Sequence, residues 1–357
     1  MTRADDAVQY AWFAALCDDD YEYLGVPDPA LRASWEHCAD IVRTAERAGF
    51  DNVLLPSGYA LGIDSVAFAG GIAAELERMA LLVAVRCGEM WPPQLARQLA
   101  TLDRMLGGRL TVNIISSDLP GETLESAPRY QRTLEVMEIV RPLLNGEPVD
   151  HHGEVYDITI DPPTARTVSG TCPPFYFGGM SEPAREVAAK AADVYLMWPD
   201  TMDQVAATVA DLTERAARYD RTLRFGYRVH VVVRETESEA RDAAARLVSK
   251  LDPATGDEIR ARSLDSTSVG VRRQAELRTD ATHDGYAEAN LWTGIGRARS
   301  GCGAAIVGDA DQVRAKLDAY RALGIDTFIL SGYPHLEEAE RFGRLVIGSR
   351  NSHAQES

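Results

Sequence analysis

Short apolar runs, rich in β-branched and aromatic residues, alternate with longer amphipathic stretches along most of the chain. Such alternation is typical of βα units, in which each strand of a parallel sheet is followed by a helix. Eight runs are expected to form strands, at residues 10–16, 52–56, 81–86, 110–115, 175–178, 194–198, 225–233 and 327–332. Eight units match a closed (β/α)₈ barrel better than an open, doubly wound sheet, which is the alternative interpretation.

The amphipathic stretches between these runs carry apolar residues at helical spacing, which predicts helices. The clearest examples are residues 34–48, 94–105, 129–144, 202–219, 238–250 and 310–323. Two segments interrupt the alternation. Residues 145–160 place turn residues around short alternating pieces, which predicts an inserted hairpin. Residues 252–303 are polar and too long for an ordinary connection, which predicts a partly helical insertion that acts as a mobile lid.

Together these elements predict an α/β fold, a TIM barrel that carries the hairpin and the lid-like insertion. We expect one domain over residues 1–350 and a disordered tail at residues 351–357. The length of 357 residues and the hydrophobic content of 45% are sufficient to fill a core of that size.

The formal net charge of −17 disfavours partners that are themselves negatively charged. The summed field repels phosphate backbones and anionic lipids, so we expect neither nucleic acid nor a membrane as a partner. The five cysteines are scattered without a Cys-x-x-Cys pair, which predicts neither a disulfide framework nor a metal site. The first residues lack the basic-then-apolar order of a signal peptide, so the expected location is the cytoplasm.

A glycine-rich turn follows the fifth expected strand. Residues 175–181 read Phe-Tyr-Phe-Gly-Gly-Met-Ser, so two glycines end the strand and Ser181 opens a helix. Glycine lets the backbone approach a ligand closely, and a helix N-terminus offers unpaired N–H groups, so this turn suits a phosphate. A tight βα turn with a capping serine is the alternative.

Polar residues at three further places are candidates for chemistry at the barrel mouth, where the loops after the strands converge. Arg228 and His230 face the same way on an expected strand, into the barrel, and a structural ion pair is the alternative to a substrate site. Tyr333 and His335 can donate hydrogen bonds or move protons, unless they are surface aromatics of a Gly-x-Pro turn. Arg299 lies in a glycine-dense piece of the insertion that can move over an anion, and an exposed loop arginine is the alternative.

Six stretches in this order resemble the bacterial-luciferase-like flavin monooxygenases. They are RQLATLDRMLGGR, PPFYFGG, RFGYRVHVVVRE, NLWTGIGRARSG, AAIVGD and LSGYPHLEEAERFG. The likeness extends from about residue 12 to residue 345, and within the family it is greatest to the FMNH₂-dependent alkanesulfonate monooxygenases. No single stretch is decisive, but the ordered combination is highly specific.

The resemblance implies a TIM barrel, FMN supplied as FMNH₂ by a separate NAD(P)H-dependent flavin reductase, O₂ as co-substrate, and a homodimer or homotetramer. Carried over position by position, it assigns the active site to Arg228, His230, Arg299, Tyr333 and His335. It also assigns the FMN phosphate to Tyr130, Gly179, Met180 and Ser181, and the isoalloxazine ring to Asn113 and Ser116.

The implied function is oxidation of a small anionic substrate, with an organosulfonate as the expected class and sulfite and an aldehyde as its products. Arg228 and Arg299 would hold the anionic head, and closure of the insertion would exclude water. His230 and Tyr333 would position the head and assist proton transfer. The alternatives are a luciferase-like monooxygenase that acts on a non-sulfonate metabolite or natural product, an F420-dependent oxidoreductase, and a non-catalytic flavin-binding paralogue.

The chain departs from the alkanesulfonate enzymes in three loops at the expected mouth. Their first loop carries a histidine and glycines, whereas residues 17–23 read Cys-Asp-Asp-Asp-Tyr-Glu-Tyr. Their cysteine after the second strand is missing from residues 56–62, and residues 87–91, Cys-Gly-Glu-Met-Trp, replace a stretch of small residues. Acidic groups there can hydrogen-bond a polyhydroxylated or amine-bearing substrate. A sugar sulfonate such as sulfoquinovose is therefore one candidate substrate, and a natural-product tailoring substrate is another.

Overall fold

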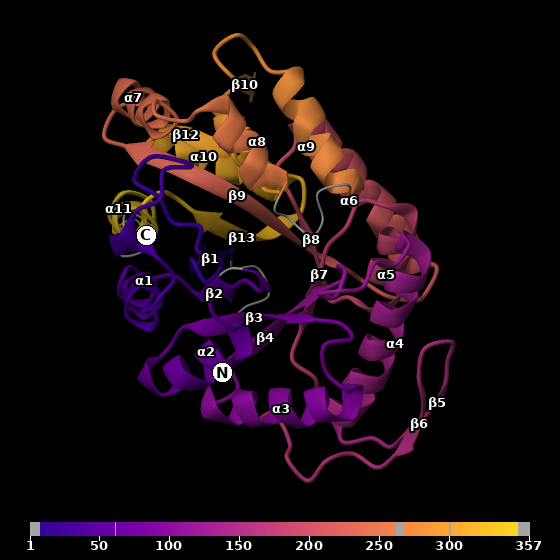
Figure 1. The fold of residues 1–357 in the computed structure, drawn as a ribbon. Coiled ribbons are helices and arrows are strands. Elements are labelled where there is room, and N and C mark those ends of the chain that lie inside the picture. The colour runs from indigo at the N-terminus through magenta and orange to yellow at the C-terminus, as the bar shows by residue number, and fades with distance from the viewer. Residues whose placement is uncertain (1–7, 61, 262–267, 300, 349–357) are drawn as a thin grey trace, which may run out of the picture.

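Eight parallel strands form a closed barrel in the computed structural model, which describes residues 8–60, 62–261, 268–299 and 301–348. Their order around the ring is β9, β13, β1, β2, β3, β4, β7, β8, and pairing of β8 with β9 closes it. Figure 1 shows these strands inside a ring of helices. The barrel strands are β1 (Gln9–Phe13), β2 (Asn52–Leu55), β3 (Ala80–Arg86), β4 (Leu110–Ile115), β7 (Phe175–Phe177), β8 (Val194–Met197), β9 (Arg224–Arg234) and β13 (Ile325–Ser331). Each overlaps one of the eight expected runs, so the expected TIM barrel is confirmed.

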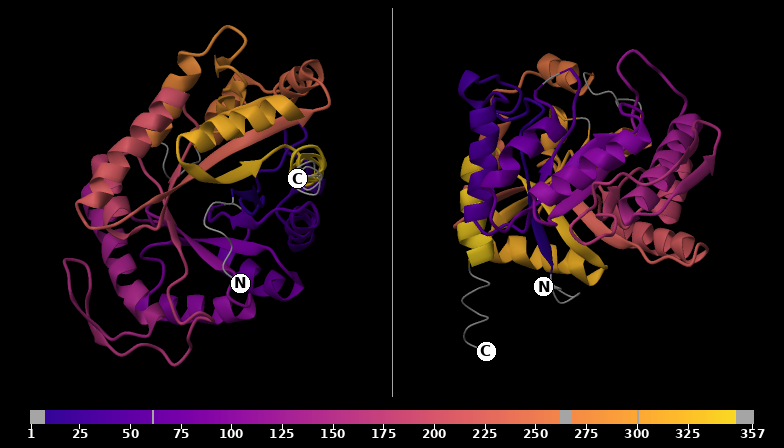
Figure 2. Two further views of the ribbon diagram at one scale, coloured as in Figure 1. Left: turned by 180° about the vertical axis from the view of Figure 1, so that it is seen from behind. Right: turned by 90° about the horizontal axis from the view of Figure 1, so that it is seen from below.

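Helices pack against the outer face of the barrel. They are α1 (Trp35–Arg47), α2 (Ser65–Ile72), α3 (Pro92–Met105), α4 (Ser126–Asn145), α5 (Glu182–Ala191), α6 (Met202–Ala217), α7 (Glu237–Leu247), α10 (Ala310–Ala322) and α11 (His335–Phe342). Short 3₁₀ helices are η1 (Pro29–Leu31), η2 (Ala73–Glu75) and η3 (Gly294–Arg297), and η4 (Gly343–Ile347) is a π-helix. All six expected helices are present, as α1, α3, α4, α6, α7 and α10. Seen from behind, α10 lies along the outside of the barrel next to β13 (Figure 2).

Alternating side chains along each strand separate two apolar layers. On β1, Tyr10 and Trp12 belong to the large core between strands and helices. Ala11 and Phe13 point the other way and belong to a small cluster inside the barrel. The other inward members of this cluster are Leu54, Leu82, Tyr176, Val194 and Ile329. Because successive strand residues face opposite sides and both sides are buried, the strands read as continuous apolar runs.

Capping side chains fix where the surrounding helices begin. Ser34 caps α1 and Ser181 caps α5, each through a hydrogen bond from a backbone N–H to its hydroxyl oxygen. Asp309 and Gln312 form a capping box at the start of α10. Each such cap contributes about 0.5–2 kcal/mol of helix stability. The start of α5 is therefore fixed beside the glycine turn that precedes it.

The expected hairpin is confirmed as β5 (Val149–His152) and β6 (Asp157–Ile160), which pair antiparallel. It projects from the edge of the barrel in Figure 1. The carboxylate of Glu135 on α4 accepts hydrogen bonds from the backbone N–H groups of residues 154–156, which holds the tip of the hairpin. The hairpin starts later than expected because α4 continues to a left-handed Gly146 that ends it.

The described part of the insertion is partly helical, as expected, and it also extends the sheet. It contains α8 (Pro253–Ala261) and α9 (Val269–Thr279), while residues 262–267 and 300 lie outside the described residues. Two short strands, β10 (Tyr286–Glu288) and β11 (Leu291–Trp292), pair antiparallel and join β12 (Ala305–Asp309). The sequence pattern does not reveal these strands because β10 and β11 lie in a polar, glycine-rich stretch and β12 directly follows it.

The strand β9 has different neighbours at its two ends. Its first residues pair with β8, up to Tyr227, whereas β12 pairs with it from His230 onward. The other edge of β9 pairs with β13. The insertion therefore joins the barrel through β12, directly beside the end of β9 that carries the expected site residues.

A buried carboxylate ties the loop after the first barrel strand to the helix after the last one. Oδ1 of Asp20 accepts hydrogen bonds from the backbone N–H and from Nδ1 of His335. Oδ2 of Asp20 lies 2.9 Å from Nε2 of His37 on α1. Burial by itself would raise the pKa of Asp20, but His335 and these hydrogen bonds lower it well below its usual range. The carboxylate is therefore ionised at neutral pH.

We predict that Asp20→Ala lowers the free energy of unfolding by about 3–5 kcal/mol at neutral pH, because it removes one partner of a buried pair. The folded-state pKa lies below the unfolded one, so this stabilisation is fully present above the unfolded value and is lost as pH falls through the folded one. Urea unfolding of wild type and variant at about pH 7 and about pH 3 measures both effects.

The matched control is Asp40→Ala on the exposed face of α1, which should change stability by about 0.5 kcal/mol or less. A difference between wild type and the Asp20 variant that stays constant from neutral to acid pH would contradict an ionised Asp20.

Candidate active site

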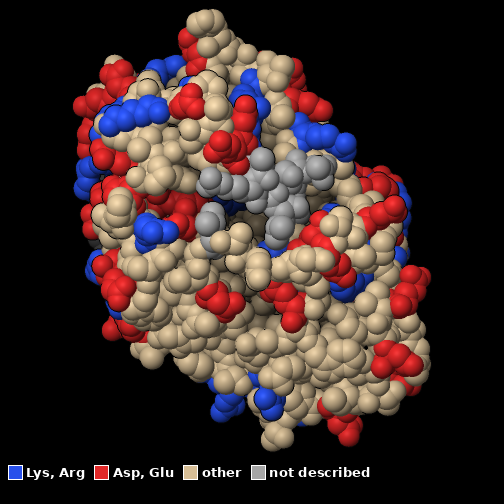
Figure 3. Space-filling view, viewed as in Figure 1, with Lys and Arg blue, Asp and Glu red and all other residues tan. Residues whose placement is uncertain are grey.

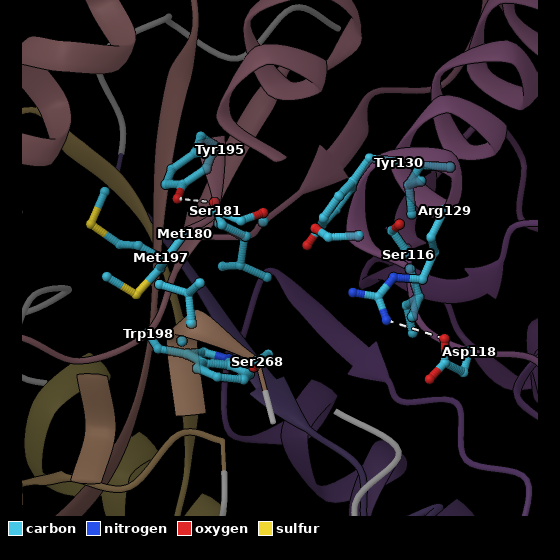
Figure 4. A pocket seen from close by; sticks show the side chains of 18 of the residues that line it. Ser116, Asp118, Arg129, Tyr130, Met180, Ser181, Tyr195, Met197, Trp198 and Ser268 are labelled. Atoms are coloured by element: carbon cyan, nitrogen blue, oxygen red, sulfur yellow. Dashed lines mark hydrogen bonds and ion pairs between the residues drawn. The ribbon is translucent and has the colours of Figure 1, made fainter. Parts of the chain in front are cut away.

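A cavity of about 520 Å³ opens at the C-terminal ends of β4, β7 and β8. This volume is within the range of about 300–1,000 Å³ that is usual for small-molecule sites. Figure 3 shows the face of the molecule seen in Figure 1, which is hollowed near its centre. The residues that sequence analysis assigns to the cofactor all line the cavity: Asn113, Ser116, Tyr130, Gly179, Met180 and Ser181. Figure 4 shows Tyr130 and Ser116 on one side of the cavity and Met180 and Ser181 on the other.

The glycine turn after β7 exposes its backbone to this cavity. A Cβ atom on Gly178 would fall 2.2 Å from the carbonyl oxygen of Leu196, and one on Gly179 would fall 3.1 Å from Oη of Tyr130. Tyr195 donates a hydrogen bond of 2.8 Å to the carbonyl of Gly179, which holds the turn in place. The turn is therefore both a tight, capped βα connection and part of the cavity wall.

Two arginines that the sequence analysis does not single out also line the cavity. Arg129 is on α4 and Arg272 is on α9, and Asp118 is the one acid among the described lining residues. Nη1 of Arg129 lies 3.3 Å from Oδ1 of Asp118, while its Nε is buried without a hydrogen-bond partner. Oγ of Ser116 is also buried without a partner. Arginines on amphipathic helices usually face solvent, so the sequence carries no signal for this pair.

The five residues that sequence analysis assigns to catalysis gather beside the ends of β9 and β13. Arg228 and His230 are inward residues of β9, Tyr333 and His335 follow β13, and Arg299 belongs to the insertion. None of the five lines the 520 Å³ cavity, so they form a second group of residues at the same mouth. Tyr333 is 7% exposed and His335 is 0% exposed, so the surface-turn interpretation of this pair is wrong.

Arg228 is buried without an acidic partner among the described residues. Its Nη2 donates to Oγ of Ser331 over 2.8 Å, and its Nη1 donates to the carbonyl of Val229 over 3.0 Å. The guanidinium carbon lies 4.4 Å from the centre of the Phe13 ring. Burial lowers the pKa of Arg228. A structural ion pair therefore does not explain why this cation is inside the barrel.

Arg299 does have an acidic partner. Its Nη1 donates to Oδ2 of Asp19 and to Oη of Tyr333, each over 2.6 Å. Burial would lower the pKa of Arg299, but Tyr333 and Asp19 raise it well above its ordinary value. Oδ1 of Asp19 is buried without a hydrogen-bond partner. The exposed-loop interpretation is wrong for Arg299, although the neighbouring Arg297 is exposed.

Each of the two imidazoles has one nitrogen in contact and one without a partner. Nδ1 of His230 lies 2.7 Å from Oγ of Ser331, and Nδ1 of His335 lies 2.9 Å from Oδ1 of Asp20. Both Nε2 atoms are buried with no hydrogen-bond partner. Burial and then two nearby guanidinium groups lower the pKa of His230 well below its ordinary value, so it is neutral. Because an ionised Asp20 only accepts, Nδ1 of His335 carries a hydrogen, which leaves Nε2 as the nitrogen that can exchange a proton.

The aromatic ring of Tyr333 joins these groups. It stacks on His230 with 5.2 Å between ring centroids, and it meets His335 edge-on at 5.1 Å. Burial raises the pKa of Tyr333, so the phenol keeps its proton. Because its oxygen accepts from Arg299, the phenol hydrogen is free to be donated elsewhere.

Trp198 links the cavity to the loop that carries Arg299. Its side chain lines the cavity, and a Cβ atom on Gly301 would fall 3.1 Å from the indole ring. A Cβ on Gly270, at the start of α9, would fall 3.0 Å from the same ring. The sequence places Trp198 at the end of an expected strand, where a core residue is the ordinary interpretation, so this role was missed.

Further features of the described residues concern metal ligands, apolar helices and thiols. No cluster of three or more His, Cys, Asp or Glu side chains among them could hold a metal ion. No helix in the described ranges is both long enough and apolar enough to cross a lipid bilayer. All five cysteines are free thiols, and burial raises the pKa of Cys87 to about 12.

Comparison with known proteins identifies the family. Residues 11–327 match the model of the luciferase-like monooxygenases. A protein of Novosphingobium aromaticivorans named sulfoquinovose monooxygenase is 64% identical over 351 residues, which are 96% of this chain and 97% of that protein. One of the same name from Agrobacterium fabrum is 54% identical over 351 residues, 97% of this chain and 91% of that protein.

A solved structure of a long-chain alkane monooxygenase has a TM-score of 0.77 at 18% identity and covers 99% of this chain and 92% of its own, which supports the barrel fold. The family match extends over most of the chain, and the two relatives are similar along nearly its whole length. The chain therefore belongs to the luciferase-like monooxygenases, a family of flavin-dependent enzymes.

Proposed function

We propose that this monooxygenase uses reduced FMN and O₂ to desulfonate sulfoquinovose, with sulfite and a sugar aldehyde as products. The observation that carries the proposal is a pair of guanidinium groups, buried on Arg228 and half-buried on Arg299, of which, among the described residues, only Arg299 is paired with a carboxylate, that of Asp19. Two relatives at 64% and 54% identity are named for this substrate. An acidic chain that takes an anionic substrate needs positive charge of this kind inside its site.

The cavity at β4, β7 and β8 fits a flavin mononucleotide. A Cβ atom on Gly179 would clash with Ala184 of α5 and approach Tyr130, so only glycine lets the turn lie this close to both. Arg129 and Arg272 add positive charge, and the positive end of the α5 dipole adjoins the turn and favours a phosphate. We assign the phosphate to Tyr130, Gly179, Met180 and Ser181, and the ring system to Asn113 and Ser116.

We place the sulfonate head between Arg228 and Arg299, the two arginines among the five residues assigned to catalysis. Their guanidinium carbons lie 4.4 Å and 6.0 Å from the centre of the Phe13 ring, so both cations face the same small space. Each can donate charge-assisted hydrogen bonds to a sulfonate oxygen. Closure of the insertion, which carries Arg299, would exclude water from this space.

Reduced FMN, when bound, would supply two electrons, so that one oxygen atom of O₂ reaches the carbon that bears the sulfonate and the other leaves as water. The carbon–sulfur bond breaks to release sulfite, and that carbon gives up one hydrogen as a proton. We place the acceptor of this proton at Nε2 of His335. The ionised Asp20, bonded to Nδ1 of the same ring, would stabilise the imidazolium that forms.

The first loop favours a sugar over an alkyl chain. Oδ1 of Asp19 is a buried acceptor without a partner, next to the proposed sulfonate site. Leaving such an acceptor unsatisfied costs about 1–3 kcal/mol, and a sugar hydroxyl would satisfy it whereas a methylene group would not. The separate flavin reductase and a homodimer or homotetramer remain predictions of the family resemblance, and the cytoplasmic location remains a prediction from the sequence.

Purified protein supplied with FMN, a flavin reductase, NADH and O₂ should release sulfite from sulfoquinovose in proportion to the sugar aldehyde formed. Alkanesulfonates of similar size should react more slowly because they lack hydroxyl groups. Sulfite assay over a panel of sulfonates measures this preference. Oxygen consumption without sulfite from any sulfonate would overturn the substrate class, and no oxygen consumption with reduced FMN would overturn the monooxygenase reaction.

Arg299→Ala should lower kcat/KM for sulfoquinovose about 10- to 100-fold, since a hydrogen bond to a charged group contributes about 1.5–3 kcal/mol. The affinity for reduced FMN should change little, because Arg299 is not part of the FMN cavity. Steady-state sulfite release and anaerobic flavin titration measure the two effects. Arg297→Ala, which removes an exposed arginine two positions away, is the control, and equal losses in both variants would contradict the role of Arg299.

Asp19→Asn should lower kcat/KM for sulfoquinovose about 10-fold or more, because it weakens a charged acceptor for a hydroxyl group. For an alkanesulfonate the same change should have a much smaller effect. The control is Asp18→Asn, where the amide oxygen can still accept from Ala33 and asparagine tolerates the left-handed backbone. If both substrates lose activity equally in Asp19→Asn, the residue acts on Arg299 and does not read the sugar.

A further inference from the structure

Ser331 links the two inward residues of β9. It ends β13, lies directly opposite His230 in the strand register and is completely buried. Its Oγ lies 2.8 Å from Nη2 of Arg228 and 2.7 Å from Nδ1 of His230. Neither the family resemblance nor the candidate motifs give this hydroxyl a role.

One arrangement of hydrogens satisfies both contacts and also gives the hydroxyl hydrogen of Ser331 an acceptor. A guanidinium group has only donors, so Oγ of Ser331 must accept from Arg228. The hydroxyl has one hydrogen of its own, and the described contacts of Oγ offer one acceptor for it, Nδ1 of His230. Nδ1 is therefore without a hydrogen. Because this imidazole is neutral, its hydrogen is on Nε2.

Nε2 of His230 then carries a buried N–H that no described residue accepts in hydrogen-bond geometry. The backbone carbonyl of Cys302 lies near the ring and raises the pKa of His230, although this is the smallest influence on that pKa. Because a carbonyl only accepts hydrogen bonds, it favours a ring nitrogen that carries a hydrogen. An unsatisfied buried donor is costly, and an acceptor from a ligand removes that cost. Arg228 and Arg299 both act on this imidazole through their charges, so the ring lies close to the same cations.

We propose that Ser331 is a positioning residue that holds His230 in the Nε2–H tautomer, so that the imidazole donates a hydrogen bond to the anionic head of the substrate. The tautomer follows from contacts that the chain makes by itself. The acceptor of the hydrogen bond rests on the proposed function.

The two buried imidazoles are thereby held for different tasks. Asp20 is an ionised acceptor, so it keeps a hydrogen on Nδ1 of His335 and leaves Nε2 to gain or lose a proton. Ser331 does the reverse for His230, because its oxygen accepts from Arg228 and its hydroxyl hydrogen has Nδ1 of His230 as its acceptor. One ring is a proton acceptor, and the other is a fixed, neutral donor.

Nitrogen-15 NMR of protein with labelled histidine tests the tautomer directly, without flavin or substrate. His230→Gln identifies the signals of this residue among the seven histidines. We expect His230 to show a protonated Nε2 and an unprotonated Nδ1 near neutral pH. A protonated Nδ1, or averaged signals from two tautomers, would overturn the proposal.

Ser331→Ala and Ser331→Thr separate positioning from packing. Without the hydroxyl, the His230 signals should become those of a mixture of tautomers, and kcat/KM for sulfoquinovose should fall about 10-fold. Threonine keeps the hydroxyl, so the single tautomer and most of the activity should return. Affinity for reduced FMN should stay within about twofold in both variants, which verifies that they are folded. An Ala variant that keeps one Nε2–H tautomer would overturn the role of Ser331.

The same measurements distinguish failure of this inference from failure of the proposed function. A His230 ring with hydrogen on Nε2 in a protein that releases no sulfite would support the role of Ser331 and refute the proposed substrate. Sulfite release by a protein whose His230 carries its hydrogen on Nδ1 would refute the role of Ser331 and leave the proposed function intact.

Discussion

The site depends on two guanidinium groups at the mouth of a closed barrel, of which only one, that of Arg299, is paired with a carboxylate in the described part of the chain. Arg228 faces inward because strand residues alternate, and its barrel position leaves it only neutral acceptors and the face of Phe13. Arg299, which belongs to the insertion, lies near the same Phe13 ring and is paired with Asp19 of the first loop. Charge that the protein leaves uncompensated in a buried place is stabilised when an anion enters.

Much of this arrangement could be predicted from the sequence. The eight barrel strands were visible because both faces of each are buried, which gives continuous apolar runs. Residues 228 and 230 are two positions apart on one strand, so the alternation of side chains placed both on the same, inward face. The strands β10 to β12 were not visible, because they lie in or directly after the polar, glycine-rich insertion; of these three, β12 pairs with β9. The roles of Arg129 and Trp198 were hidden too, since only the folded chain brings α4 and the end of β8 to one cavity.

The carboxylates of the first loop show how adjacent residues of one type can diverge. Asp20 is wholly occupied by His335 and His37, which fixes the loop and orients an imidazole. Asp19 keeps one oxygen for Arg299 and leaves the other without a partner. The sequence showed three acids in a row, but the division of labour between them depends on which elements pack against each oxygen.

The indole of Trp198 touches the wall of one binding site and the backbone beside Arg299 at once. A ring in that position couples ligand binding in the cavity to ligand binding beside Arg299, because a displacement of the ring at one site also changes the other. Thermodynamic linkage then demands reciprocity: the factor by which one ligand changes the affinity for the second equals the factor in the opposite direction. The strength with which one ligand favours or disfavours the other is therefore a property that this single side chain can influence.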